Sequence, residues 1–240
     1  MNLGTLITGS ARSGTTLALR VHCPDLTAEE ERHNSDFNEP LPLTQAIRKN
    51  QMLEAERILT ERLGNRHHLV KSPHACFLAP YLKPNYHLIV IFRDLRLILP
   101  SMLRHPNVLR YELRGSLSLE RALTMARQSY ERAFLYEGSM EVWNYGFWEE
   151  WKIRNRNTGH LYGRPHETSD RVLEDIRRTG EIFSKESFSS DIWEEFCETN
   201  AVTNQQRSEV LKSNEAIRLL YEKRGFRIKT YDDIYAKRET

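Results

Sequence analysis

Apolar residues recur along this chain in two patterns, short continuous runs and longer stretches with helical spacing. The clearest run covers residues 87–92, which are continuous and β-branched, as a buried central strand of a parallel sheet would be. Strands are predicted at residues 3–8, 68–70, 87–92 and 226–230. Helices are predicted at residues 14–21, 43–63, 75–82, 95–103, 119–137, 143–153, 170–183 and 204–224. This alternation predicts an α/β fold of three layers, a central parallel sheet flanked by helices, with a largely helical C-terminal half.

The turn after the first predicted strand is rich in glycine and hydroxyl groups. Residues 9–16 read Gly-Ser-Ala-Arg-Ser-Gly-Thr-Thr and lead directly into a helical pattern. Such a turn builds a cradle of backbone N–H groups at a helix N-terminus, where the helix dipole also favours anions. The Walker A pattern needs a lysine directly after the second glycine, and Thr15 stands there instead. The loop therefore predicts a P-loop-like anion site that is poorly suited to a nucleoside triphosphate.

Two other predicted strands end in residues suited to anions or to proton transfer. One strand runs into Lys71-Ser72-Pro73-His74, and the next runs into Arg93, with Ser101 eight residues later in the following helix. In an open parallel sheet, ligands sit outside the carboxyl ends of the strands. Cations from several strand ends converging on one loop suit a ligand with more than one phosphate.

The loop and the two strand ends together resemble the motifs of one enzyme family, the sulfotransferases that use 3'-phosphoadenosine 5'-phosphosulfate (PAPS). Residues 11–16 are similar to the family's 5'-phosphosulfate loop, and residues 89–94 with Ser101 resemble its 3'-phosphate motif. Residues 71–77 are similar to the Lys-Ser/Thr-Pro-Ala-Tyr-Phe run of heparan sulfate sulfotransferases. The resemblance covers about residues 3–105, and residues 230–234 resemble a Tyr-Glu-Asp-Leu segment found late in the family.

The resemblance implies a sulfuryl donor, a product and a set of site residues. PAPS is the expected donor and adenosine 3',5'-bisphosphate the expected product, with no metal required. The implied cofactor-binding residues are Ser10, Ala11, Arg12, Ser13, Gly14, Thr15, Thr16, Arg93 and Ser101. Arg12 and Lys71 also count as catalytic, because they would stabilise the negative charge that develops on the 5'-phosphate. Residues 1–240 are expected to form a single sulfotransferase-like domain, in which the polar stretch 154–190 is a candidate lid or insertion.

Three residues are candidates for the general base that removes the acceptor's proton. In Golgi-type relatives the base is a glutamate in the loop after the first helix. Aligning residues 23–26 with the corresponding run of tyrosylprotein sulfotransferases puts Glu30 or Glu31 at that place. In cytosolic relatives the base is a histidine just after the Lys71 position. His74 lies one residue out of that register, so it ranks behind the two glutamates.

Composition narrows the class of protein and of partner. A chain of 240 residues suits one large domain, and a net charge of +2 is too small to argue for nucleic acid. No apolar run approaches the roughly 20 residues that span a bilayer. Cys23, Cys76 and Cys197 are scattered without metal spacing, so reduced thiols in a cytoplasmic protein are expected. The expected acceptor is a hydroxyl or amine of a small molecule, glycan or peptide.

Two other functions stay open. A P-loop kinase using ATP and magnesium is opposed by Thr15 and by the lack of an acidic, magnesium-holding strand end. The other is a non-catalytic module that binds adenosine 3',5'-bisphosphate or a sulfated ligand. Family members usually continue past their Tyr-Glu-Asp-Leu segment through a basic, glycine-containing segment that contacts the 3'-phosphate. In this chain either Arg154, Arg156 and Arg164 take over that contact or nucleotide binding is weakened.

Overall fold

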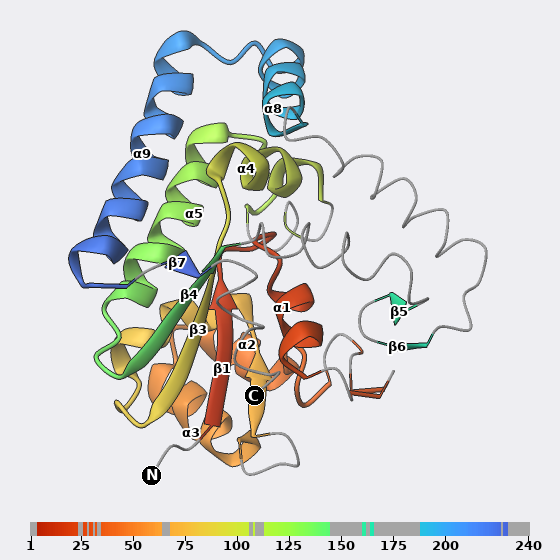
Figure 1. Ribbon diagram of the computed structural model, residues 1–240, viewed down its shortest axis with the longest axis vertical. Helices are drawn as coiled ribbons and strands as arrows, with labels where there is room; N and C mark the ends of the chain where they lie inside the picture. The colour runs from red at the N-terminus through yellow and green to blue at the C-terminus, as the bar shows by residue number, and fades with distance from the viewer. Residues whose placement is uncertain are drawn as a thin grey trace.

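The computed structural model describes residues 4–23, 26–27, 29–30, 32, 35–63, 68–105, 108, 113–144, 160–161, 164–165, 188–226 and 228–229. A five-stranded parallel sheet lies at the centre of these residues (Figure 1). Its strands, in spatial order, are β2 (Leu69–Lys71), β1 (Gly4–Gly9), β3 (Tyr86–Phe92), β4 (Ser139–Asn144) and β7 (Ile228–Lys229). The predicted α/β fold, a parallel sheet flanked by helices, is confirmed. Because every neighbouring pair is parallel, the carboxyl ends of all five strands meet at one edge of the sheet.

Helices cover the sheet and its connections. The α-helices are α1 (Thr15–His22), α2 (Leu41–Arg48), α3 (Met52–Arg62), α4 (Leu95–Arg104), α5 (Leu119–Phe134), α8 (Phe188–Thr199) and α9 (Asn204–Lys223). Two short 3₁₀ helices, η1 (Pro73–Phe77) and η2 (Ala79–Tyr81), follow β2. A separate antiparallel pair is formed by β5 (His160–Leu161) and β6 (Arg164–Pro165). Figure 1 shows α4, α5 and α9 gathered on one side of the molecule and α1 on the other.

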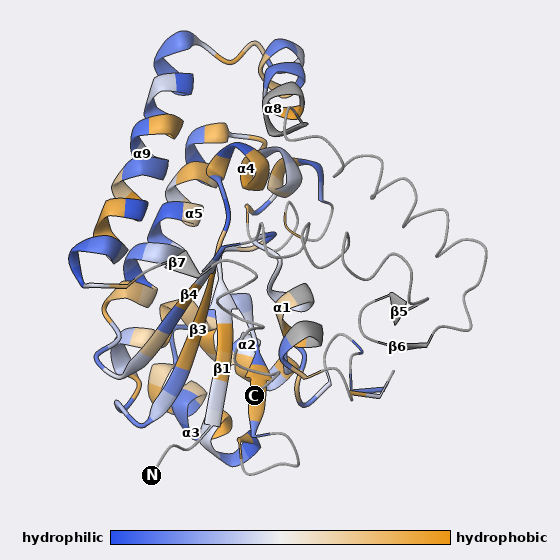
Figure 2. Cartoon of the chain, viewed as in Figure 1, coloured by the Kyte–Doolittle hydropathy of each residue, from blue (hydrophilic) through white to orange (hydrophobic). Residues whose placement is uncertain are grey.

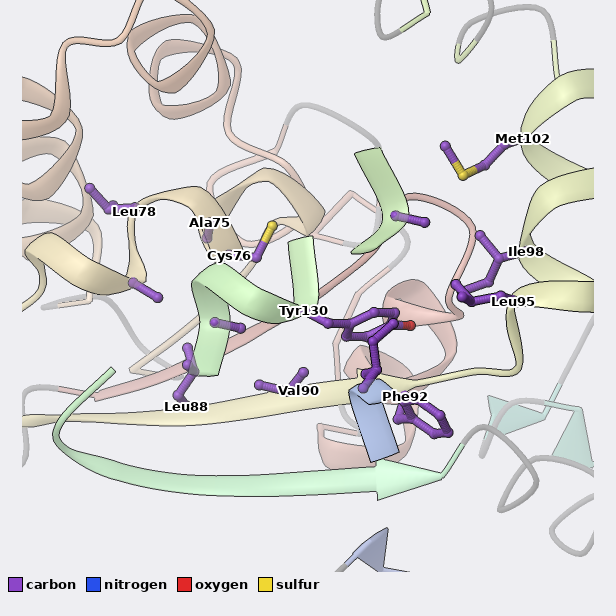
Figure 3. Packing of buried hydrophobic residues seen from close by; sticks show 14 of the residues in the cluster. Ala75, Cys76, Leu78, Leu88, Val90, Phe92, Leu95, Ile98, Met102 and Tyr130 are labelled. Carbon is purple, nitrogen blue, oxygen red and sulfur yellow. The ribbon is translucent and has the colours of Figure 1, made fainter. Parts of the chain in front are cut away.

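Alternating side chains of the strands face two different helical layers. Leu88, Val90 and Phe92 of β3 belong to a core shared with η1, α4 and α5, and Figure 3 shows them beside Tyr130. Ile89 and Ile91 are the intervening positions, so they face the opposite side of the sheet, where α1 packs against β1. Burial on both faces explains why β3 is continuous in apolar residues rather than alternating.

The hydropathy pattern of the elements agrees with this layering. Figure 2 shows hydrophobic residues concentrated on β1 and β3, whereas α9 is hydrophilic along much of its length. Val210, Ile217 and Tyr221 form the buried face of α9. The helix begins at a capping box in which Thr203 and Gln206 satisfy each other's backbone N–H groups. Among the described helices, none has a stretch long and apolar enough to cross a membrane.

The single helix predicted at residues 43–63 is wrong, because the structure has two helices there. Asn50, which follows α2, adopts a left-handed conformation with φ of 58°. The N–H groups of Asn50 and Gln51 donate to the carbonyls of Ile47 and Ala46, which closes the end of α2. Asparagine tolerates this conformation better than other non-glycine residues, so a C-terminal cap interrupts a pattern that stays helical on both sides.

The helix predicted at residues 143–153 is also wrong where the structure describes it, because Trp143 and Asn144 end strand β4. The β4 residues pair in parallel with β3, from Ser139 opposite His87 to Asn144 opposite Phe92. Aromatic spacing after Trp143 favoured a helix, but the sheet edge offered by β3 overrides local periodicity.

Two further predictions differ in detail or fall outside the described residues. The helix predicted at 75–82 is divided into η1 and η2, since Pro80 lacks the N–H that a continuous α-helix needs. Within the predicted lid at 154–190, the structure describes only β5, β6 and the first residues of α8. The helix predicted at 170–183 lies outside the described residues.

Candidate functional site

The loop between β1 and α1 has the backbone geometry of an anion cradle. The N–H of Ser13 donates to the carbonyl of Ser10 over 3.0 Å, which closes a tight turn. Arg12 and Gly14 both have positive φ angles, 69° and 97°, so the chain reverses before entering α1. The first N–H groups of α1 have no partner within the helix and lie at the positive end of its dipole. An anion held by this loop would satisfy them.

Gly9 is needed for the loop to leave the sheet. Its φ is 153°, and a Cβ at this position would lie 2.6 Å from Ser13 Oγ and 2.8 Å from the carbonyl oxygen of Ile91. The second contact is with backbone of the central strand β3, which cannot move aside cheaply. Glycine therefore allows the loop to pack directly against the end of β3.

The two halves of the predicted nucleotide site meet in the structure. Arg12 Nε donates to Ser101 Oγ over 2.9 Å, and Arg93 Nη1 donates to the carbonyl of Arg12 over 2.8 Å. Arg12 belongs to the loop after β1, Arg93 follows β3, and Ser101 lies in α4. Two guanidinium groups and a hydroxyl thus gather at the carboxyl edge of the sheet. Guanidinium groups are well suited to bind phosphate, because their N–H donors match its oxygens.

The position of Ser101 depends on how α4 begins. Asp94 caps this helix by accepting from the N–H of Arg96 over 2.8 Å. Asn214 of α9 adds a second cap, because its Oδ1 accepts from the N–H of Leu95 over 3.1 Å. The Asn214 amide also donates to Asp94 Oδ2 over 3.4 Å. The start of α4 is therefore fixed by α9 as well as by its own cap.

Lys71 lies on the other side of the loop and is almost fully buried, at 1% exposure. Its Nζ donates to Asn38 Oδ1 over 3.1 Å and forms an ion pair with Glu39. The chain at residues 37–39 runs alongside β2, since the N–H of Lys71 donates to Phe37 and the N–H of Glu39 donates to Lys71. This added edge places the Glu39 carboxylate beside the Lys71 ammonium group. The Glu39 side chain is 19% exposed and so is partly open to solvent.

His105 lies at the end of α4, one helical turn beyond Ser101. Burial and the positive charge of Arg12 lower the pKa of its imidazole, and the negative charge of Glu39 acts in the opposite direction. The charges of Arg12 and of Glu39, the carboxylate beside Lys71, therefore both act on the pKa of the His105 ring. Its Nδ1 is buried and has no hydrogen-bond partner in the part of the chain that the structure describes.

The remaining candidates for the base occupy different surroundings. The Glu30 carboxylate accepts from the N–H of Thr27 over 2.7 Å within a local turn. Glu31 lies outside the described residues. His74 is the second residue of η1, and its Nε2 lies 3.4 Å from Arg48 Nη2.

Sequence reasoning missed Glu39, Asn38, His105 and Asn214. Glu39 lies in the same connection between α1 and α2 as the glutamates chosen, directly before Pro40. The one feature that could have pointed to Glu39 is its position directly before helix α2. Asn214 has no local signal, because its amide caps a helix that begins 119 residues earlier in the chain.

The residues present fit an anionic ligand. The loop at 10–14 offers backbone donors, while Arg93 and Ser101 approach it from β3 and α4. The hydroxyl of Ser101 accepts from Arg12 and keeps its own hydrogen to donate. Among the described residues, no group of three or more His, Cys, Asp or Glu side chains is placed to hold a metal ion.

A cavity of about 440 Å³ lies elsewhere, against α2 and α3. Its charged lining residues are largely paired with each other, Arg57 with Glu54 and Glu61, and Arg62 with Asp36. The cavity shares no residue with the Arg12–Arg93–Ser101 cluster. Surface charges that neutralise each other attract a ligand only weakly. We therefore take the carboxyl edge of the sheet, and not this cavity, as the candidate site.

No family model matches this chain, and searches of curated proteins and of solved structures return no significant match.

Proposed function

We propose that this protein is a sulfotransferase that uses PAPS to sulfate a hydroxyl or amine of a small molecule, glycan or peptide. The observation that carries the proposal is the meeting of Arg12, Arg93 and Ser101. The resemblance assigns Arg12 to the 5'-phosphosulfate and the other two to the 3'-phosphate of one nucleotide. One ligand that carries both groups requires the loop after β1 and the start of α4 to lie near each other, and these contacts support that arrangement. Residues 1–240 then form a single domain with a P-loop-like sheet.

The loop and its arginines would hold the nucleotide through its two phosphate groups. Backbone N–H groups at residues 14–16, with Arg12, would bind the 5'-phosphate, and Arg93 and Ser101 would bind the 3'-phosphate. The nucleotide, when bound, supplies the sulfuryl group and leaves as adenosine 3',5'-bisphosphate. The chain's own contribution is to orient the reactants in line and to stabilise negative charge on the leaving oxygen.

Glu39 is the general base that the geometry favours. Its side chain is partly open to solvent, and its carboxylate is oriented by Lys71 at the same edge of the sheet as the loop. In the proposed step Glu39 takes the proton from the acceptor hydroxyl or amine as that atom bonds to sulfur. Lys71 would hold the carboxylate in place and add positive charge near the leaving phosphate. Glu30, Glu31 and His74 remain the alternative bases that sequence reasoning predicts.

Calorimetric titration with three nucleotides tests the proposal. The full chain should bind adenosine 3',5'-bisphosphate with micromolar affinity, corresponding to about −8 kcal/mol. Adenosine 5'-phosphate should bind more weakly, because it lacks the group assigned to Arg93 and Ser101. ATP with magnesium should also bind weakly, since Thr15 replaces the Walker lysine. Tighter binding of ATP than of the bisphosphate would favour the kinase and contradict the proposal.

A turnover assay separates the enzyme from a binding module. Incubation of the protein with PAPS labelled with ³⁵S and a panel of phenols, amines, glycans and tyrosine peptides should yield a sulfated acceptor. Bisphosphate binding without any transfer, unchanged by substitution of Glu39, would favour the non-catalytic module instead.

A further inference from the structure

The hydroxyl of Tyr130 lies where β1 and β3 separate. Tyr130 belongs to α5 and is fully buried, and its hydroxyl donates to the carbonyl of Ile91 over 3.2 Å. The same oxygen accepts from the N–H of Arg93 over 3.2 Å. One hydroxyl can do both, because it is a donor and an acceptor at once. Burial raises the pKa of this phenol, so the donating hydrogen stays in place at neutral pH.

The two backbone groups that Tyr130 contacts are those that a continuing strand β1 would use. Gly9 lies opposite Ile91 in the register, so Ser10 would come opposite Phe92. In a parallel ladder, the N–H of a bonding residue donates to the carbonyl of the residue before its opposite partner. Its carbonyl accepts from the N–H of the residue after that partner. A continuing ladder would therefore join the Arg93 N–H to the carbonyl of Ser10. In this protein that carbonyl accepts from Ser13 instead.

We propose that Tyr130 is a positioning residue for the nucleotide site. Its hydroxyl takes over the Arg93 N–H, which frees the Ser10 carbonyl to close the loop at residues 10–14. It also fixes the backbone of Arg93, from which the guanidinium reaches the carbonyl of Arg12. One hydroxyl thus sets both halves of the site relative to each other. The identity of the ligand in this inference rests on the proposed function.

The surroundings of Tyr130 hold its ring in one position. The ring packs against Phe92 with centroids 5.6 Å apart, and Figure 3 shows it within the cluster that contains Val90 and Leu95. The hydroxyl of Tyr221 of α9 donates to the backbone carbonyl of Tyr130 over 2.9 Å. Helix α9 therefore supports the site at two points, through Tyr221 and through the Asn214 cap of α4.

Tyr136 provides a matched control at the opposite end of β3. Its buried hydroxyl accepts from the N–H of Tyr86 over 3.0 Å and donates to the carbonyl of Tyr86 over 2.6 Å. Tyr130→Phe and Tyr136→Phe each remove one oxygen and its contacts with the backbone of β3, and Tyr136→Phe also removes a 3.2 Å contact with the carbonyl of Lys83. Both variants should lose a similar amount of thermal stability, and only the first should affect the site.

The first test compares the affinity of the two variants for adenosine 3',5'-bisphosphate. Tyr130→Phe should weaken binding about tenfold, and Tyr136→Phe should leave it within about twofold of the wild type. In the Arg93→Ala background, Tyr130→Phe should cause a smaller loss than in the wild type, because the part of its effect that acts through Arg93 is already gone. Equal losses in the two tyrosine variants, or full additivity with Arg93→Ala, would overturn the proposal.

The second test needs no ligand and so separates this inference from the proposed function. Amide hydrogen exchange at Arg93 and at residues 10–14 should be about tenfold faster in Tyr130→Phe than in Tyr136→Phe. Unchanged exchange at these amides would overturn the positioning role, whatever the protein binds. If exchange is faster in Tyr130→Phe but the wild-type protein does not bind the bisphosphate, the positioning role stands and only the proposed function is rejected.

Discussion

Arg12 donates to Ser101 over 2.9 Å, although 89 residues separate them along the chain. The arginine lies in a loop between a strand and a helix, and the serine lies inside helix α4. Their contact joins the end of β1 to the element that follows β3. Because Arg93 also donates to the carbonyl of Arg12, the cluster presents positive charge from two neighbouring strand ends.

Arg93 and Ser101 should discriminate between nucleotides with and without a 3'-phosphate. Arg93→Ala and Ser101→Ala should each weaken binding of adenosine 3',5'-bisphosphate by roughly tenfold or more, the value of one hydrogen bond to a charged group. Adenosine 5'-phosphate should bind nearly as before, as calorimetry would measure. Arg104→Ala is a matched control. It also removes a cation at α4, but one that pairs with Glu195 and was not assigned to the nucleotide site, so binding should not change. Equal losses for both nucleotides would contradict the 3'-phosphate role.

Glu39 should be required for transfer and dispensable for nucleotide binding. Glu39→Gln keeps an oxygen that can accept from Lys71 but removes the basic carboxylate. Transfer of labelled sulfuryl should fall by about 10²–10⁴-fold, the usual contribution of a general base. Bisphosphate affinity should stay within about twofold of the wild type, which is a difference of less than about 0.5 kcal/mol.

The alternative bases form a panel for the same assay. Glu30→Gln, Glu31→Gln and His74→Gln should retain most of the activity. A loss confined to Glu30→Gln or Glu31→Gln would return the base to the loop after α1. Normal turnover in Glu39→Gln would rule this carboxylate out as the base.

Gly9 should be far less tolerant of a side chain than Gly115, although both have positive φ angles. Gly9→Ala would bring a Cβ to 2.8 Å from the carbonyl oxygen of Ile91, whereas a Cβ at Gly115 meets nothing within 4 Å. The cost at Gly115 should be about 1 kcal/mol of conformational strain. At Gly9 overpacking adds about 1–3 kcal/mol to that strain. Urea unfolding of the two variants measures the difference, and equal midpoints would contradict it.

His105 should titrate below the usual imidazole pKa of about 6.5. Burial and Arg12 lower its pKa in the folded protein, so the unfolded chain binds the proton more readily. This contribution to stability is fully present at pH values above the unfolded pKa. It is lost as the pH falls from that value through the lower pKa of the folded protein. Histidine NMR should therefore show a low midpoint for the signal that His105→Gln removes. His105→Gln should also flatten the fall in unfolding midpoint below about pH 6.5. A midpoint above the ordinary value would mean that Glu39 outweighs burial and Arg12, and would contradict the lowered pKa.

Local patterns in the sequence were enough to predict most of the sheet. The strands β1, β2 and β3 each contain a short apolar run, and each was found within one or two residues of its place. Strand β4 was missed, because Met140 and Val142 alternate beside an aromatic stretch with helical spacing. Its pairing with six residues of β3 decides that conformation, and pairing is not a local property.

The candidate site divides along the same line. Gly9, Arg12 and Gly14 could be recognised because a strand, a tight turn and a helix follow one another in the chain. Glu39 was passed over for glutamates closer to α1, because only the alignment of residues 37–39 beside β2 brings its carboxylate to Lys71. Tyr130 and Asn214 gave no signal, since each serves backbone groups far away in the sequence.

The sequence by itself determined the alternation of strands and helices, the strand–turn–helix form of the loop at residues 9–16 and the order of the cationic strand ends. These features follow from side-chain period and turn chemistry over a few consecutive residues. Only the tertiary structure decided which of the charged residues meet. Strand register and helix packing decide three relationships: the contact between Arg12 and Ser101, the burial of Lys71 against Glu39, and the position of the Tyr130 hydroxyl between β1 and β3. Register and packing are set by how the whole core fills its volume, which no short stretch of sequence encodes.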